Sequence, residues 1–254
     1  MAVIDEVRNK QPLIHHLTNQ VVMNFTANGL LAFGGAPVMA KETEEAADMA
    51  AIADGLLINI GTITKGELPA MIAAGKAANE KGIPVVLDPV GAAATPFRTD
   101  ALKQILKQVR PTAIKGNVGE IAHLVDIPWE TRGVDSLGEG DVETIARKAA
   151  DQYGTMAIVT GKVDVICDGE KVLKNETGHP FLTKITGAGC LLGSVITACL
   201  AVEGDKIEQA LEAVAFYGQA AVYAAETELV KGPGTFLPRF IDALTMDMET
   251  LERR

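Results

Sequence analysis

The chain is organised around Lys184-Ile185-Thr186-Gly187-Ala188-Gly189-Cys190, which runs directly into the apolar segment Leu191-Leu192-Gly193-Ser194-Val195-Ile196. Its two glycines let the backbone turn tightly and approach a ligand closely, because neither carries a Cβ atom. The apolar segment has the length and composition of a buried helix. The amides of Ala188, Gly189 and Cys190 would then point out of the helix N-terminus, where the helix dipole favours an anion. The stretch therefore predicts an anion cradle suited to phosphoryl transfer.

Outward from this stretch, buried apolar runs alternate with amphipathic or alanine-rich segments along the chain. This alternation predicts an α/β fold, a doubly wound and mostly parallel sheet with helices on both faces. Strands are expected over residues 13–17, 36–39, 55–61, 83–87, 112–114 and 156–159. Helices are expected over residues 21–33, 43–53, 68–81, 97–109, 120–125, 141–153 and 206–226. Two further helices are expected, one from the glycine loop to about residue 202 and a last one that begins at about residue 235. Thr18 or Asn19 is the expected cap of the helix that begins near residue 21, and Asp141 that of the helix that ends at 153.

One segment departs from this alternation. Two short strands, 164–168 and 171–174, flank Asp168-Gly169, which is a hairpin signal. They predict an antiparallel hairpin at one edge of the sheet. Because the 254 residues include no recognisable linker and no repeat of fixed period, we expect one domain over residues 1–254.

The composition restricts the classes of partner. The formal net charge of −10 argues against nucleic acid or an anionic membrane surface. The cysteines at 167, 190 and 199 are odd in number and lack metal-ligand spacing, which favours the reducing cytoplasm. Residues 1–11 carry acidic side chains and no apolar signal core, so no export is expected. The uncharged run between Lys184 and Glu203 approaches the length of a membrane span, but its glycine-rich start favours a buried helix.

Polar residues lie where the predicted strands end, which is where doubly wound sheets bind ligands. Asp88 could form an Asx turn or lie near Mg²⁺, a cation that takes few protein carboxylates together with waters and phosphates. Glu120, in Asn117-x-x-Glu120, could stabilise its own helix, but its place beside Asp88 favours a shared metal. Lys115 could be solvated or meet phosphates, and Thr160 could be a local cap or a phosphate-binding hydroxyl.

Cys190 admits three interpretations: an inert buried thiol, a covalent nucleophile with His179 or His123 as base, or a contact to a substrate hydroxyl. Its place in the first turn of a helix is one that lowers the pKa of a thiol. No cysteine-hydrolase signature surrounds it, so covalent catalysis is the least favoured. His15 and His16 are expected to be structural, with at most one of them facing the core.

These motifs resemble a known superfamily. The loop Thr186-Gly187-Ala188-Gly189-Cys190, the motif Asn117-x-x-Glu120 and the strand end Asp88-Pro89-Val90-Gly91 are similar to those of ribokinase-like proteins. Within that superfamily, Ile14-His15-His16-Leu17-Thr18-Asn19-Gln20-Val21-Val22-Met23-Asn24 and Gly34-Gly35-Ala36-Pro37-Val38-Met39 resemble the hydroxyethylthiazole kinases of thiamine salvage. The resemblance covers essentially the whole chain.

The resemblance implies a ribokinase-like fold and ATP-dependent, Mg²⁺-assisted phosphorylation of the hydroxyl of 4-methyl-5-(2-hydroxyethyl)thiazole. It also implies a homotrimer whose thiazole sites lie between subunits. By the same resemblance, the thiazole contacts are Met39, Gly187, Asn19 and Val21, and the ATP contacts are Lys115, Thr160 and Asn117. The residues implied for the metal are Asp88 and Glu120. The implied catalytic loop is Gly187, Ala188, Gly189 and Cys190, and the amides of its last three residues would hold the transferred phosphoryl group.

Two positions qualify this assignment. The family often has arginine where this chain has Lys115, which keeps the charge but loses the bidentate fork. The wider superfamily usually has an aspartate base where this chain has Cys190, and cysteine there is normal for thiazole kinases. We therefore expect Cys190 to orient the hydroxyl and accept its proton late. The alternatives are a hydroxymethylpyrimidine or pyridoxal-type kinase, an ATP- or ADP-dependent repair lyase for hydrated nicotinamide nucleotides, and a non-catalytic binding protein.

Overall fold

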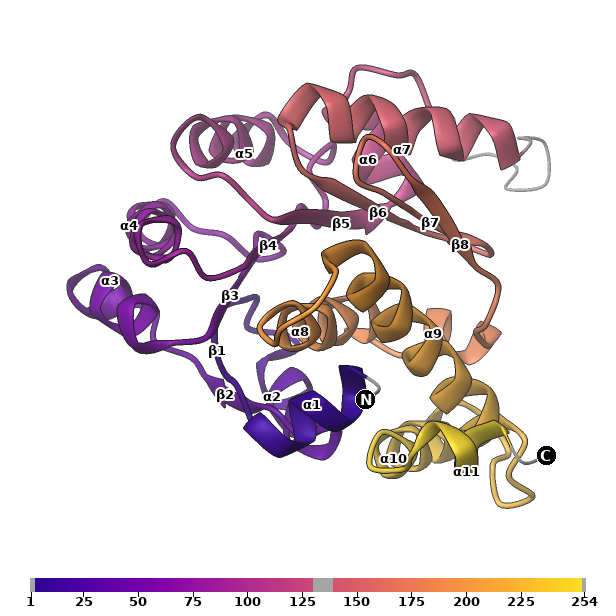
Figure 1. The fold of residues 1–254 in the computed structure, drawn as a ribbon. Coiled ribbons are helices and arrows are strands. Elements are labelled where there is room, and N and C mark those ends of the chain that lie inside the picture. Colours follow the sequence, from indigo (N-terminus) through magenta and orange to yellow (C-terminus); the bar gives the residue numbers. More distant parts are fainter. Residues whose placement is uncertain (1–2, 130–138, 253–254) are drawn as a thin grey trace.

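The structure, a computed structural model, describes residues 3–129 and 139–252. Within these ranges, eight strands form one sheet of order β2-β1-β3-β4-β5-β6-β7-β8 (Figure 1). Strands β1 to β6 pair in parallel, whereas β7 pairs antiparallel with β6 and with β8, which confirms the expected edge hairpin. The strands are β1 Leu13–Leu17, β2 Ala36–Val38, β3 Gly55–Asn59, β4 Val85–Asp88, β5 Ala113–Asn117, β6 Met156–Thr160, β7 Asp164–Cys167 and β8 Val172–Asn175.

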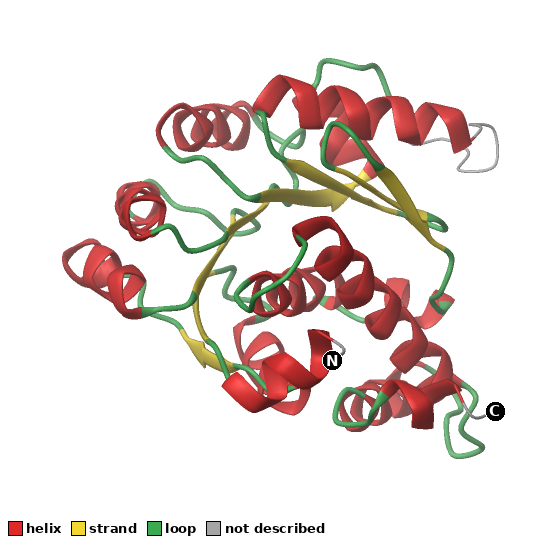
Figure 2. Ribbon diagram, in the orientation of Figure 1, coloured by secondary structure: helices red, strands yellow, loops and turns green. Residues whose placement is uncertain are grey.

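Helices cover both faces of this sheet, as the alternation of elements predicts (Figure 2). One hydrophobic core lies between the sheet and α3 to α7, and the other packs α1, α2 and α8 to α11 against the opposite face. The helices are α1 Val3–Lys10, α2 Met23–Phe33, α3 Thr43–Ile52, α4 Glu67–Lys81, α5 Pro96–Gln108, α6 Val118–Leu124, α7 Glu139–Tyr153, α8 Ala188–Leu200, α9 Lys206–Ala225, α10 Pro233–Ala243 and α11 Met248–Glu252, with a short 3₁₀ helix over Pro180–Lys184.

Helix α8 is the central element of the second core. Every one of its residues except Gly189 is buried, and it contacts β1, β3 and β4. The uncharged run therefore forms a buried helix, as expected. In the described ranges, no helix combines the length and the apolar character needed to cross a membrane.

Several expected helix ends are wrong. Val22, not Thr18 or Asn19, precedes the first residue of α2, and within the described ranges no side chain caps that end. The Asn19 side chain instead donates hydrogen bonds to Asn59 and Cys190. Helix α7 begins at Glu139, so Asp141 lies inside its first turn rather than capping it. Because short polar residues cap helices only where the chain geometry allows it, a propensity for capping does not identify the cap.

The chain termini also differ from expectation. Residues 3–10 form α1, an amphipathic helix that buries Ile4 and Val7 against the core, although no element was expected there. The expected last helix is two helices, and the first of them begins two residues early, at Pro233. Proline suits a first helical position because the amide it lacks would have no partner there.

His15 and His16 are both buried, because helices cover both faces of β1. The expectation that at most one would face the core is therefore wrong, while the structural interpretation of His16 is supported by its contacts. Its Nδ1 donates to the Ile14 carbonyl at 2.8 Å, so in the neutral ring Nε2 accepts the hydroxyl of Ser194 on α8 at 2.7 Å. Burial lowers the pKa of His16 to about 4.

The substitution His16→Gln should change how stability depends on pH. Since the folded pKa of His16 lies near 4 and its ordinary value is 6.5, the unfolded chain binds more protons between these values, and stability due to this group rises with pH. Wild type should gain about 3 kcal/mol of unfolding free energy relative to the variant between pH 4 and 6.5. Urea unfolding of both proteins across that range measures it. A difference independent of pH would contradict a buried, neutral His16.

Candidate active site

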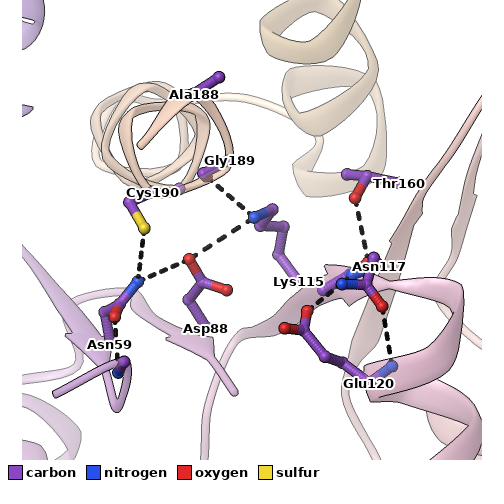
Figure 3. A network of polar contacts seen from close by, with 12 residues as sticks. Asn59, Asp88, Lys115, Asn117, Glu120, Thr160, Ala188, Gly189 and Cys190 are labelled. Atoms are coloured by element: carbon purple, nitrogen blue, oxygen red, sulfur yellow. Dashed lines mark hydrogen bonds and ion pairs between the residues drawn. The ribbon is translucent and has the colours of Figure 1, made fainter. Parts of the chain in front are cut away.

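Four neighbouring strands each have a polar residue at the carboxyl end, and these ends lie side by side (Figure 3). Asn59 ends β3 and is level with Asp88 at the end of β4; Asn117 ends β5 and is level with Thr160 at the end of β6. The first turn of α8 lies over these strand ends, so the glycine loop and the polar residues are close together in space. The sequence predicted this meeting from the order of its elements.

Gly187 shapes the start of α8. It has φ +92° at the N-cap position, a left-handed conformation that disfavours side chains. A Cβ atom there would also lie 2.5 Å from Val22 Cγ1, so the close approach of α2 and α8 needs glycine as well. The first helical hydrogen bond runs from the Leu191 amide to the Gly187 carbonyl at 2.9 Å. The amides of residues 188–190 precede that bond and are available to an anion, as the glycine loop predicted.

Two side chains hold the carbonyl groups of this first turn. The Tyr217 hydroxyl donates to the Ala188 carbonyl at 2.7 Å, and Lys115 Nζ donates to the Gly189 carbonyl at 2.9 Å. Tyr217 comes from α9 and Lys115 from β5, so the turn is fixed from two sides. A lysine beside a helix N-terminus adds to the positive potential of the helix dipole, which favours a phosphate at this place.

Asp88 and Lys115 form a buried ion pair. Lys115 Nζ lies 3.5 Å from Asp88 Oδ2, and both side chains are almost fully inaccessible. Burial raises the pKa of Asp88 to about 6, although the charge of Lys115 opposes the shift. Burial lowers the pKa of Lys115, but nearby negative charge, chiefly that of Asp88, outweighs it and leaves that pKa raised. The second carboxylate oxygen of Asp88, Oδ1, is buried and has no hydrogen-bond partner among the residues that the structure describes.

Glu120 is fully engaged in holding local structure. Its Oε2 accepts the Asn117 amide at 2.9 Å while the Asn117 side chain accepts the Glu120 amide at 3.0 Å, which is a capping box at the start of α6. Its Oε1 accepts the Gly91 amide at 3.0 Å and so ties α6 to the loop after β4. The helix-stabilising interpretation of Glu120 is therefore correct. Its charge also raises the pKa of Asp88, so the two carboxylates act on one region.

These residues fit a magnesium ion better than a densely coordinated metal. The described ranges contain no group of three or more His, Cys, Asp or Glu side chains arranged to hold a metal. Mg²⁺ needs only one or two protein carboxylates and completes its shell with waters and phosphates. The unpartnered Oδ1 of Asp88 meets that requirement, with Glu120 contributing charge.

Cys190 is held by two amide side chains. Its Sγ accepts from Asn19 Nδ2 at 3.3 Å and from Asn59 Nδ2 at 3.2 Å. Burial, and after it the charge of Asp88, raises the pKa of the thiol. The expectation of a lowered pKa is therefore wrong, because loss of solvation outweighs the helix N-terminus.

The two histidines considered as bases for Cys190 have other contacts. His123 lies 3.3 Å from the Thr99 hydroxyl through Nε2, and His179 Nδ1 accepts the amide of Phe181 at 3.1 Å. Together with a thiol whose pKa is raised, these contacts leave covalent catalysis by Cys190 without support.

The remaining predicted residues lie around this network. The Thr160 hydroxyl donates to the Gly116 carbonyl at 3.3 Å, so a local contact already uses it. Val21 is 70% exposed on the loop between β1 and α2, beside Val22, which packs against Gly187. Met39 is half-buried and directly follows the edge strand β2. Val21 and Met39 offer apolar surface and take no part in the polar network.

Three residues of the site were not assigned from the sequence. Asn59 was recognised only as a polar strand end, yet it contacts both Asp88 and Cys190. Arg98 on α5 joins two loops of the site, donating to the Gly61 carbonyl at 2.5 Å and to the Val90 carbonyl at 3.2 Å. Neither Arg98 nor Tyr217 lies in a motif, so no local signal in the sequence identifies them.

Comparison with known proteins gives consistent matches. The model of the hydroxyethylthiazole kinase family matches residues 4–249. A curated relative, hydroxyethylthiazole kinase 1 of Oceanobacillus iheyensis, is 56% identical over 96% of this chain and 95% of its own length. The solved structure of the hydroxyethylthiazole kinase protein from Pyrococcus horikoshii is 39% identical, covers 99% of this chain and 94% of its own, and superposes with a TM-score of 0.90. A ribokinase-like superfamily protein of Enterococcus faecalis, 14% identical over 91% of this chain and 86% of its own with a TM-score of 0.66, shows the shared fold.

Cys190 should react slowly with thiol reagents at neutral pH. A raised pKa leaves little thiolate, and only the thiolate attacks iodoacetamide. Labelling followed by peptide mass spectrometry should give a rate below that of free cysteine at pH 7, rising as the pH passes 9. Faster labelling than free cysteine at pH 7 would show that the helix N-terminus dominates after all.

Proposed function

The chain belongs to the hydroxyethylthiazole kinase family, and we propose that it transfers the γ-phosphoryl group of ATP to the hydroxyl of 4-methyl-5-(2-hydroxyethyl)thiazole in thiamine salvage. The observation that carries the proposal is the meeting of the α8 N-terminus with the buried pair of Lys115 and Asp88. A phosphoryl transition state is loose and spreads negative charge over its equatorial oxygens, so positioning and electrostatics supply most of the rate. This site offers oriented amides and a fixed cation for that purpose.

The phosphates of ATP would bind at the α8 N-terminus. The amides of Ala188, Gly189 and Cys190 donate to the transferred group, and Lys115 adds a positive charge already fixed by the Gly189 carbonyl. Thr160 and Asn117, at the ends of the two adjoining strands, are the further ATP contacts that we assign. Because these donors are held before the substrate arrives, little reorganisation is needed during transfer.

Asp88 and Glu120 are the residues that we assign to Mg²⁺. Support comes from the unpartnered Asp88 Oδ1 and from the electrostatic coupling of the two carboxylates. When bound, the ion would supply neutralising charge to the phosphate oxygens. Glu120 would act mainly through charge and through its hold on the loop after β4, because both of its oxygens already accept backbone amides.

The alcohol would approach Cys190 from the side of α2. We assign the thiazole contacts to Met39, Val21, Asn19 and Gly187. Cys190 orients the hydroxyl, and its thiolate form takes the hydroxyl proton late, when most of the bond to phosphorus has formed. The raised pKa of Cys190 supports a late and modest role, because the thiolate that can accept a proton is the minor form at neutral pH.

The assembly and the setting belong to the same proposal. We propose that residues 1–254 form one catalytic domain and that three copies make a homotrimer with thiazole sites between subunits. Exposed apolar side chains on and beside α2, Val21 at 70% and Leu31 at 58%, support a subunit contact on this side. The free cysteines at 167, 190 and 199 support a reducing cytoplasm.

The alternatives explain the site less well. A pyrimidine or pyridoxal-type kinase would be expected to carry aspartate at position 190, where this chain has cysteine. A repair lyase for hydrated nicotinamide nucleotides would consume ATP without forming a phosphorylated alcohol. A binding protein would have no need of the buried charged pair, which costs desolvation energy that binding alone does not require.

Product formation from purified protein, ATP and Mg²⁺ tests the assignment. The hydroxyethylthiazole and the hydroxymethylpyrimidine are supplied in parallel reactions, and phosphorylated products are identified by mass spectrometry. Phosphorylated thiazole alone is the expected result. Phosphorylated pyrimidine, or ATP hydrolysis with no phosphorylated alcohol, would keep the fold family and overturn the function.

Replacement of the thiol should have a moderate effect. Because a late proton acceptor contributes modestly, Cys190→Ala should lower kcat by no more than about 100-fold, and Cys190→Asp should remain active. Steady-state kinetics on folded variants measure both. Loss of turnover by many orders of magnitude in Cys190→Ala, or a folded but inactive Cys190→Asp, would assign Cys190 a larger role.

A further inference from the structure

The side chain of Asn59 uses its whole hydrogen-bonding capacity inside the site. Its Oδ1 accepts the Gly61 amide at 2.9 Å and Asn19 Nδ2 at 3.1 Å. Its Nδ2 donates to Asp88 Oδ2 at 2.8 Å and to Cys190 Sγ at 3.2 Å. A side-chain amide has two donor hydrogens and an oxygen with two lone pairs, so each has one partner here. With 1% of the residue exposed, water does not compete for these contacts.

The backbone of Gly61 decides which way this amide points. A backbone N–H can only donate, so the atom facing it must be the Asn59 oxygen. The nitrogen is thereby turned toward Asp88 and Cys190. The flipped arrangement would set the oxygen against a carboxylate and two N–H groups against each other, so the environment selects one orientation.

Asn19 closes the arrangement around the sulfur. Its Nδ2 donates to Asn59 Oδ1 at 3.1 Å and to Cys190 Sγ at 3.3 Å, so the three side chains form a ring. The Cys190 sulfur accepts from both amides, and its own hydrogen is left to point away from them. The direction of the thiol is thus set by Asn59 at the end of β3 and by Asn19 in the loop after β1.

We propose that Asn59 is a positioning residue for phosphoryl transfer, fixing the sulfur of Cys190 relative to the carboxylate of Asp88. This inference deepens the proposed function and rests on it. Cys190 belongs to the alcohol side of the reaction and Asp88 to the phosphate side, and Asn59 is the side chain that bonds to both. A residue that aligns the two halves without touching either substrate affects the rate of transfer more than the affinity for ATP or the thiazole.

Kinetics of Asn59→Ala and Asn59→Asp test the assignment. The aspartate keeps the acceptor for Gly61 but loses both donors. We expect kcat to fall by about 100-fold in each variant, while both KM values change by less than about threefold. Asn79→Ala is the matched control, because Asn79 also bonds through both amide atoms, to the backbone of Arg110, away from this site. Its kcat should stay at the wild-type value, and a kcat in folded Asn59→Ala equal to that of the control would overturn the proposal.

A double-mutant cycle separates positioning from general weakening of the fold. If Asn59 acts through the Cys190 sulfur, Asn59→Ala should cost less in a Cys190→Ala background than in wild type. Fully additive effects on kcat would overturn the link between the two residues. Thermal unfolding of every variant identifies losses caused by unfolding, and the aspartate variant serves if the alanine variant is unstable.

The S–H stretching band gives a readout that does not depend on activity. With Cys167→Ala and Cys199→Ala in place, the thiol of Cys190 is the only one left in the chain. Removing a donor to the sulfur by Asn59→Ala should shift its infrared band, whereas Asn79→Ala should not. An unshifted band in folded Asn59→Ala would overturn the proposal. A shifted band in a protein that phosphorylates no alcohol would instead confirm the contact and overturn the proposed function.

Discussion

The buried contact of Lys115 with Asp88 and the Gly189 carbonyl is the constraint on which the site depends. Two charges removed from water are costly unless they meet each other at close range with good partners. Strand β4 supplies one, strand β5 the other, and the first turn of α8 supplies the carbonyl, so three elements must come together for the charges to be compensated. The same requirement that stabilises the junction also fixes the Lys115 ammonium beside the N-terminus of α8.

Around this junction, polar side chains form hydrogen bonds that link the neighbouring loops and helices. Glu120 ties α6 to the loop after β4, and Arg98 ties that loop to the one after β3. Such cross-links keep donors and charges in place, which is how a protein gains rate in a reaction with a loose transition state. The neutral Cys190 fits this scheme, since its sulfur is held by amides and not by a charged base.

The sequence predicted the sheet, its edge hairpin and the gathering of Asp88, Lys115 and the glycine loop, because these follow from element order and from where parallel strands end. It did not predict the properties that arise from packing. The pKa of Cys190 rises because of burial, which a position in the first helical turn does not reveal. The contacts of Asn59 depend on a backbone amide two residues away and on a side chain 40 residues earlier in the chain.

The two edges of the sheet bear on how copies of this chain can associate. At one edge β2 is three residues long and contains Pro37, which offers no amide to a further strand. At the other edge β8 is four residues long and exposes Lys174. Short edges with proline or lysine resist the strand-by-strand addition that leads to aggregation. Contacts between copies of this chain are therefore expected to form through side-chain surfaces and not by extension of the sheet.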